Sequence, residues 1–204
     1  MSKQIKSKQR VVKFAEVFTN NREVTAMLDM VQDELEKLTS TVLEPACGTG
    51  NFLIEVLKRK MDTVHRVYRN RRDYELCSML VFSTVYGLDI QKDNTIETKN
   101  RLFDWFICDY EAVFKEKPSK TLQTALNFIL KKNIQCADSL SMVNDKKQPL
   151  VIPEWTLCED GKMLRKDVYY KDLLNGIEHN YIKSYSYKWM KETNFLGGLS
   201  SQYA

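Results

Sequence analysis

Histidine is scarce in this sequence, and its cysteines are scattered. There are only two histidines and five cysteines among 204 residues. No two cysteines form the C-x-x-C pair of zinc sites and redox motifs, and their wide spacing argues against a disulfide framework. We therefore expect reduced thiols, no metal site and a cytoplasmic protein. The cysteines are Cys47, Cys77, Cys108, Cys136 and Cys158.

Long apolar runs are also missing. No stretch reaches the length that a membrane helix needs, and the amino terminus is basic and polar. The sequence therefore predicts a soluble protein that does not bind membranes. Its length suits a single domain. The net charge of +4 is compatible with a polyanionic partner but does not require one.

Glycine is rare as well, with seven in the chain, yet two of them lie in one turn. Gly48 and Gly50 follow an apolar run, Thr41–Leu43, that is typical of a buried strand, and they precede a long amphipathic helix. Glycines at such a turn let a ligand approach the backbone. Glu44 would repel a dinucleotide pyrophosphate, whereas it would attract the ammonium and sulfonium groups of S-adenosylmethionine.

Two further acidic residues lie near the ends of predicted strands. Asp89 belongs to the apolar run Val85–Ile90, and Asp138 to the run Asn133–Leu140. A carboxylate at the end of the second strand of a parallel sheet can accept hydrogen bonds from both ribose hydroxyls of a nucleoside. A helix cap or a turn is the alternative role for each residue. The order of strand, glycine turn, helix, strand and acid predicts an α/β fold with a parallel sheet.

The stretch Leu43–Leu53, together with these acidic strand ends, closely resembles the cofactor-binding elements of S-adenosylmethionine-dependent DNA methyltransferases. The adenine-N6 enzymes of restriction-modification systems are most similar, in particular the type I-like modification subunits. The resemblance covers roughly residues 14–140. It implies a Rossmann-like methyltransferase sheet, mainly parallel with helices on both faces, with S-adenosyl-L-methionine as the cofactor and DNA as the partner.

The resemblance also implies roles for particular residues. The segment Val17–Asn20 is similar to an F-x-T-P-type element that closes over the methionine end of the cofactor, although Asn20 replaces the proline. From the residues alone, this segment is a hydrophobic staple beside a helix cap. In the family, the acids at the two strand ends contact the ribose and the adenine amino group. The implied cofactor-binding residues are Phe18, Thr19, Glu44, Pro45, Ala46, Gly48, Gly50, Asn51, Phe52, Asp89, Ile90, Asp138 and Ser139.

Adjacent prolines are absent, and this separates the chain from the family. None of the four prolines adjoins another, so the Asn/Asp-Pro-Pro-Tyr loop that holds the target amine is missing. The nearest match in order is Pro153-Glu154-Trp155, where Glu154 could accept from an amine and Trp155 could stack on a base. A buried Trp155 beside a surface Glu154 is the favoured alternative. We therefore assign no catalytic residue.

Three segments are predicted along the chain. Residues 1–13 are expected to be a flexible basic arm, and residues 14–180 the S-adenosylmethionine-binding domain. Residues 181–204 form a tail rich in aromatic and basic residues. Within the domain, Glu159–Lys162 predicts a hairpin turn, so a hairpin would replace the last strands of the family's sheet, or those strands are truncated.

Three functions remain open from the sequence. The first is a small adenine-N6 DNA methyltransferase with a degenerate target loop, in a restriction-modification or phage-defence context. The second is a catalytically inactive subunit that binds the cofactor beside a catalytic or specificity partner. The third is an interaction protein that has kept the fold and lost the pocket. A nicotinamide oxidoreductase is disfavoured because the third glycine is absent and Glu44 has the wrong charge.

Overall fold

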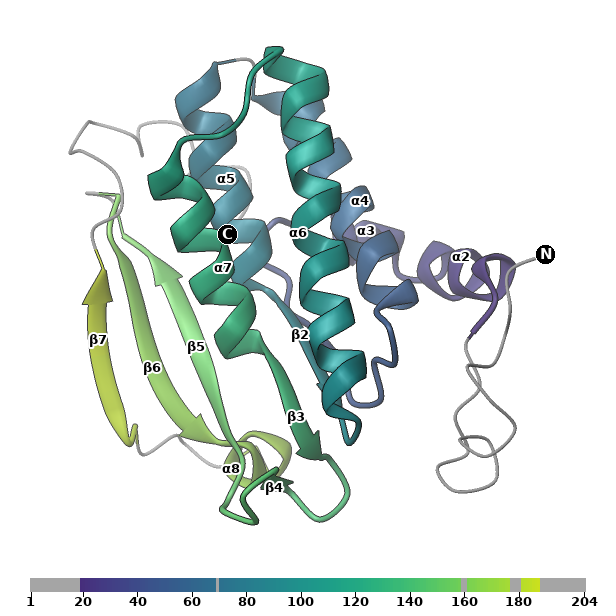
Figure 1. Ribbon diagram of the computed structural model, residues 1–204, viewed down its shortest axis with the longest axis vertical. Coiled ribbons are helices and arrows are strands. Elements are labelled where there is room, and N and C mark those ends of the chain that lie inside the picture. Colours follow the sequence, from purple (N-terminus) through teal and green to yellow (C-terminus); the bar gives the residue numbers. More distant parts are fainter. Residues whose placement is uncertain (1–18, 69, 159–160, 177–180, 188–204) are drawn as a thin grey trace.

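A mostly parallel sheet forms the centre of the fold (Figure 1). The computed structural model describes residues 19–68, 70–158, 161–176 and 181–187. The first three strands run parallel, and the fourth is antiparallel to the third. This arrangement fits the predicted α/β, Rossmann-like class. In spatial order the strands are β1 (Val42–Glu44), β2 (Val85–Asp89), β3 (Ile134–Asp138) and β4 (Val143–Asn144).

Long helices cover one face of this sheet. Val42, Val85 and Ile134 of the parallel strands pack with them in the larger hydrophobic core. The predicted amphipathic helix after the glycine turn is confirmed, because Leu53 and Val64 on one of its faces are both fully buried. The helices of this layer are α4 (Asn51–Val67), α5 (Arg71–Ser83), α6 (Lys92–Phe114) and α7 (Lys120–Asn133).

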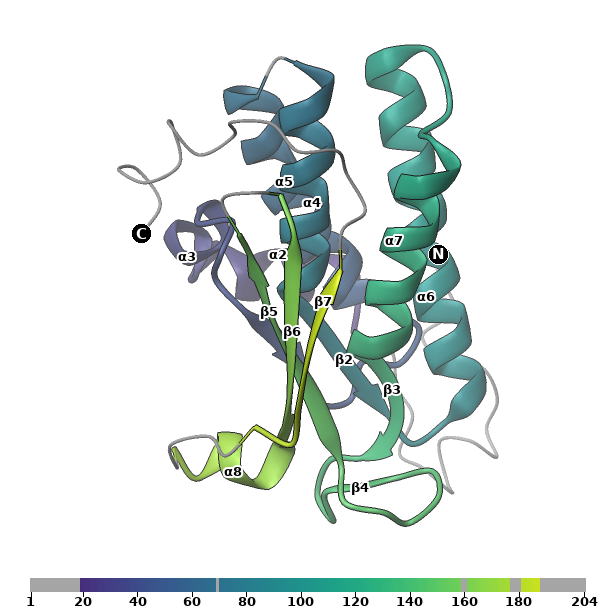
Figure 2. The ribbon, with the colours of Figure 1, turned by 90° about the vertical axis from the view of Figure 1, so that its left-hand side faces the viewer.

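The opposite face carries no such helical layer in the described residues. Leu150, Ile152 and Tyr170 pack there against Tyr86 and Leu88 in a second, smaller core. Figure 2 shows the antiparallel sheet that follows, with the short α8 (Tyr170–Leu174) at its lower end. The expectation of helices on both faces is therefore wrong for this part of the chain. The strands of the second sheet are β5 (Val151–Leu157), β6 (Met163–Tyr169) and β7 (Lys183–Tyr187).

The predicted hairpin is confirmed, and a third strand joins it. β5 and β6 pair over their whole length, from Val151 opposite Tyr169 to Leu157 opposite Met163. Side chains of β6 alternate between buried and more exposed over most of the strand, as the two-residue period of a strand predicts. β7 pairs with β6 although its sequence shows no clear periodicity. The predicted basic arm and most of the predicted tail lie outside the described residues.

The first helical segment is divided in two. α2 (Asn21–Asp29) begins at the predicted helix cap, where Asn20 and Glu23 form a capping box. A second helix, α3 (Gln32–Glu36), follows a break at Val31, although the spacing of the apolar residues from Val24 to Leu38 is typical of one continuous helix. The sequence missed this break because Leu28 and Leu35 are both buried and so keep the apolar pattern of a single helix.

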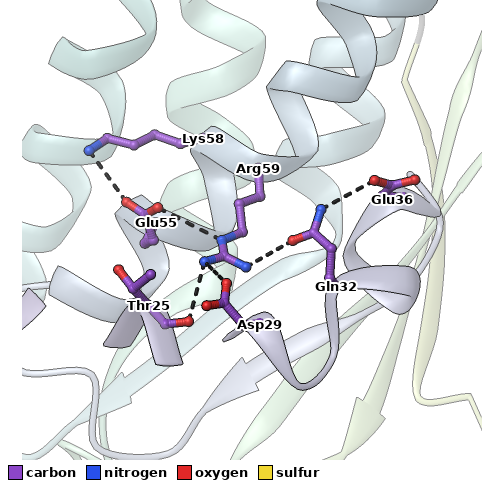
Figure 3. Close-up of polar contacts among 7 residues, drawn as sticks. All are labelled: Thr25, Asp29, Gln32, Glu36, Glu55, Lys58 and Arg59. Carbon is purple, nitrogen blue, oxygen red and sulfur yellow. Dashed lines mark hydrogen bonds and ion pairs between the residues drawn. The ribbon is translucent and has the colours of Figure 1, made fainter. Parts of the chain in front are cut away.

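Arg59 of α4 connects this pair of helices to the core of the fold (Figure 3). Its guanidinium donates to Gln32 Oε1 at 2.8 Å and to Asp29 Oδ1 at 2.7 Å. It also donates to the backbone oxygen of Thr25 at 3.3 Å. Glu55, one turn earlier on α4, lies 3.8 Å from Arg59 Nε. These contacts fix α2 and α3 against the helix that begins at the glycine turn.

Candidate cofactor site

The glycine turn joins β1 to α4 through backbone that glycine adopts most readily. Gly48 has φ 52°, and Gly50, the N-cap of α4, has φ 83°. A Cβ atom on Gly50 would lie 2.7 Å from Cγ2 of Thr98 on α6. The left-handed backbone and the close approach of α6 therefore both require glycine at position 50.

Two side chains of α6 hold this turn in place. Thr98 Oγ1 donates to the carbonyl oxygen of Gly48 at 2.9 Å. Arg101 Nη1 donates to the carbonyl oxygen of Thr49 and, at 2.9 Å, to Asn51 Oδ1. Residues three apart on a helix share a face, so Thr98 and Arg101 act together. The sequence analysis missed both, because only the folded chain shows that this face of α6 meets the turn.

Asp89, the last residue of β2, lies against the glycine turn. Its Oδ2 accepts a hydrogen bond from Gly48 N at 2.9 Å. Its Oδ1 accepts from Gln91 N at 2.7 Å and from Asn94 Nδ2 at 3.2 Å. The carboxylate therefore joins the end of β2 to the turn and to the start of α6.

A cavity of about 180 Å³ opens at the turn. Six of the predicted cofactor-binding residues line it, together with Met27, Cys47 and Thr49. Burial raises the pKa of the Cys47 thiol to about 12, so this side chain is not a nucleophile at neutral pH. The six predicted residues are Thr19, Glu44, Ala46, Gly48, Asn51 and Phe52.

Glu44 is the acidic residue of this cavity. Burial raises the pKa of its half-buried carboxyl group, and a hydrogen bond from Ala46 N at 3.3 Å partly opposes that shift. On the other side of the cavity, Asn51 Nδ2 donates to the carbonyl oxygen of Thr19 at 3.4 Å. Thr19, two residues before α2, is thereby hydrogen-bonded to the start of α4.

Asp138 and Ser139 lie at the end of β3, outside the described lining of this cavity. Asp138 Oδ1 accepts from Leu140 N at 3.0 Å and from Ser141 N at 3.2 Å, and its Oδ2 accepts from Ser141 Oγ at 2.5 Å. The hydrogen bonds from Ser141 lower the pKa of Asp138. These contacts are those of a turn, which is the alternative role that the sequence left open for Asp138.

The remaining predicted residues are dispersed around the turn. Pro45 is exposed, Gly50 is buried, and Ile90 is 51% exposed at the end of β2. None of the three is among the described lining of the cavity. Phe18 lies outside the residues that the structure describes.

The Pro153-Glu154-Trp155 segment lies in β5 and contributes to packing. Trp155 Nε1 donates to Asn133 Oδ1 at 2.8 Å, and its ring contacts that of Phe128 at 6.2 Å between centroids. Glu154 lines a different cavity, which shares no described residue with the one at the glycine turn. Trp155 is partly buried against the larger core, and these contacts fit the packing role that was its alternative.

The described residues, 19–68, 70–158, 161–176 and 181–187, hold neither a cluster of metal ligands nor a membrane helix. In those ranges, no three His, Cys, Asp or Glu side chains gather closely enough to hold a metal ion. No helix there is long and apolar enough to cross a lipid bilayer.

Comparisons with known proteins bear on the family of this chain. The family model described as the MmeI DNA-methyltransferase domain matches residues 15–151, which include β1, the glycine turn, β2 and β3. A Methanocaldococcus jannaschii protein, named as a type II restriction enzyme and methyltransferase, is 28% identical over 139 residues. That match covers 65% of this chain and 11% of the relative, so the chain corresponds to a small part of it. No solved structure matches the chain. Because the family model covers more than half of the sequence, the chain belongs to the MmeI DNA-methyltransferase domain family of restriction-modification proteins.

Proposed function

We propose that this chain binds S-adenosyl-L-methionine at the glycine turn and serves in the methylation of adenine N6 in DNA. The observation that carries the proposal is the half-buried Glu44 carboxylate in the cavity beside Gly48 and Asn51. Burial disfavours the ionised form of this acid, and a cationic ligand would restore it. S-adenosylmethionine brings two cationic groups, whereas a dinucleotide would bring a pyrophosphate of the wrong sign.

The other cofactor contacts follow the edge of the parallel sheet. Asp89, hydrogen-bonded to the turn through Gly48 N, is proposed for the ribose hydroxyls, with Ile90 beside it. Asp138 and Ser139 at the end of β3 are proposed for the adenine amino group. Support for these roles comes from the strand order, because the carboxyl ends of parallel strands share one edge of the sheet.

When bound, the cofactor would supply a methyl group on a sulfonium for transfer to the amine of the target base, which would lose a proton while the sulfur leaves as a neutral thioether. The contribution of this chain is to bind and orient the cofactor: Glu44 attracts the charged end, while Thr98 and Arg101 hold the turn. The adenine-N6 specificity follows from the resemblance of the turn and the acidic strand ends. No described residue is assigned to accept the amine's hydrogens.

A second candidate is a cofactor-binding subunit that needs a partner for catalysis. The packing of Trp155 favours it, because the indole that could have stacked on a flipped base is bonded to Asn133 instead. The double-proline loop of the family is missing from the chain. In this case the chain would bind the cofactor, and another polypeptide would supply the groups that hold the target amine.

Calorimetric titration with S-adenosylmethionine and with its demethylated product tests the cofactor site. Glu44→Gln is expected to weaken S-adenosylmethionine binding by about tenfold, or ~1.4 kcal/mol. Glu154→Gln, which removes the same charge from the other cavity, is the matched control and should leave the affinity unchanged. Equal affinities for wild type and Glu44→Gln would overturn the site, as would the absence of binding.

Transfer of a radiolabelled methyl group to DNA separates the two candidates. Label in the N6 position of adenine with the chain alone supports the active methyltransferase. Cofactor binding without transfer, with activity that appears only when a second polypeptide is added, supports the subunit.

A further inference from the structure

The strand that carries the glycine turn has an open edge. β1 pairs in parallel with β2, with Val42 opposite Val85 and Glu44 opposite Gly87. Val42 N donates to Thr84 O, so the backbone groups of Val42 and Glu44 face β2. In a parallel ladder the residue between them, Leu43, directs its N–H and C=O to the other side. No strand in the described part of the chain pairs with that side.

A groove runs along this open edge. It encloses a cavity of about 550 Å³. One wall consists of Leu38, Thr41 and Leu43 at β1, and the opposite wall is β5, from Ile152 to Leu157. β5 pairs only with β6 among the described strands, so its other edge is also open. The groove therefore lies between two strands that each lack a neighbour on the facing side.

The ends of the groove show its direction. Ser83 and Thr84 line it where β2 begins, and Tyr170 and Leu173 of α8 line it near the smaller core. The groove thus follows the length of the strands. Glu154 is the one charged residue among its described lining, so the groove suits an extended and mainly apolar segment.

The edge of β1 also lacks the features that protect strand edges from pairing. Such edges usually carry lysine, proline or a bulge. Thr41, Val42 and Leu43 include none of these. β5, by contrast, carries Pro153 on its open edge. The neighbouring residues Ile152 and Glu154 form the backbone hydrogen bonds with β6, so the backbone nitrogen of Pro153 faces away from β6.

We propose that the edge of β1 binds a parallel, mainly apolar β-strand from a second polypeptide, which completes the methyltransferase sheet. In doubly wound sheets the strand with the glycine turn is interior, and the order 3-2-1-4 places a fourth strand beside it. Here the order is β3-β2-β1, and the fourth place is the groove. The relative from Methanocaldococcus shows that proteins with this region can be far longer, since the match covers 11% of it.

This inference rests on the proposed function, because the incoming strand belongs to a methyltransferase sheet. It also gives a structural basis for the second candidate function, the cofactor-binding subunit that needs a partner for catalysis. The carboxyl end of a strand parallel to β1 would emerge at the same sheet edge as the glycine turn, next to Glu44. The second polypeptide would therefore bring its own residues to the cofactor cavity.

The test uses the segment of the Methanocaldococcus relative that follows its matched 139 residues as the probe. The probe is added as a separate chain and also joined to residue 204 by a flexible linker, which raises its effective concentration to the millimolar range. Hydrogen exchange at the Leu43 amide is the readout. We expect it to slow by about tenfold or more when the strand pairs.

Two variants show whether the probe uses this edge. Thr41→Lys places a charge at the exposed end of the groove and should abolish the slowing of exchange. Thr121→Lys makes the same change on the exposed surface of α7, on the helical side, and should leave it intact. An unchanged Leu43 amide with both forms of the probe would overturn the proposal, as would slowing that survives in Thr41→Lys.

Two other outcomes would also overturn the proposal of a different polypeptide at this edge. A dimer of the chain alone that dissociates in Thr41→Lys would identify a second copy as the occupant. Protection of Leu43 in the chain alone would mean that the edge is already covered. Because Thr41 lies outside the cofactor cavity, S-adenosylmethionine titration of the same variant stays a separate measure of the proposed function.

Discussion

Two features require glycine at position 50, the left-handed backbone and the close approach of Thr98, and substitutions at Gly50 and Gly161 separate their contributions to stability. Gly50→Ala introduces a left-handed alanine, which costs about 1 kcal/mol, and also a Cβ that would meet Thr98 Cγ2 at 2.7 Å. Overpacking of this kind adds about 1–3 kcal/mol. Urea unfolding of Gly50→Ala should therefore show a loss of about 2–4 kcal/mol.

Gly161 provides the matched control for this substitution. It also has positive φ, at 76°, but a Cβ there would meet nothing within 4 Å. Gly161→Ala should lose only the backbone contribution of about 1 kcal/mol. Equal losses of unfolding free energy in the two variants would show that the contact with Thr98 adds nothing to the cost of the substitution at Gly50.

Lys60 is a fully buried lysine whose hydrogen bonds hold the segment after α3 in place. Its Nζ donates to the backbone oxygens of Lys37 at 2.9 Å, Leu38 at 3.4 Å and Ser40 at 2.7 Å. Lys60→Met would leave these carbonyl groups without their donor. We expect a loss of about 2–4 kcal/mol in the free energy of unfolding at pH 7.

The same residue predicts a pH dependence. Burial lowers the pKa of Lys60 from 10.5 to about 8 in the folded chain. Between these two values the unfolded chain binds more protons at this site, so the contribution of Lys60 to stability rises with pH. The difference in unfolding free energy between wild type and Lys60→Met should increase from pH 8 to pH 10, by at most about 1.4 kcal/mol per unit. A flat difference would show that the pKa is not lowered.

At the scale of elements, α6 positions the cofactor turn. Arg101→Met removes the donor to Thr49 O and to Asn51 Oδ1, so the turn should lose its fixed geometry. We expect S-adenosylmethionine affinity to fall by about tenfold, ~1.4 kcal/mol. Arg101→Lys should recover part of it, since it keeps one charged donor.

The control for this prediction is the neighbouring exposed residue, in Asn100→Met. It should leave the affinity at the wild-type value. Thermal unfolding is measured in parallel, because a purely structural role would lower the melting temperature of Arg101→Met without a specific loss of affinity. Unchanged affinity for S-adenosylmethionine in Arg101→Met would show that Arg101 of α6 does not contribute to cofactor binding.

The elements differ in how far the sequence could predict them. β1, the glycine turn and the capping box at Asn20 were predictable because short-range patterns determine them. The break at Val31 and the strand β7 were not, because each depends on packing against residues distant in the chain. Arg101 was missed for the same reason, since nothing in its own neighbourhood shows that it meets the turn.

At the scale of the whole molecule, Asn133 connects the two sheets. Its buried Nδ2 donates to the backbone oxygens of Phe82 at 3.1 Å, Ser83 at 3.2 Å and Val85 at 3.1 Å. Its Oδ1 accepts from Trp155 Nε1 at 2.8 Å. One amide thus joins the end of α7, the connection from α5 to β2, and β5 of the C-terminal sheet.

A double-mutant cycle on this residue tests whether the sheets stabilise one another. Asn133→Ala removes the donor that three carbonyl groups share and leaves the indole without its acceptor, and it should cost about 3–5 kcal/mol, whereas Trp155→Phe should cost about 1–2 kcal/mol. Because both changes break the same 2.8 Å bond, the double variant should lose less than the sum of the single losses. A coupling energy of about 0.5–3 kcal/mol in urea unfolding is expected. Strict additivity would mean that the indole bond carries no share of the connection, and that the C-terminal sheet is held by its apolar contacts alone.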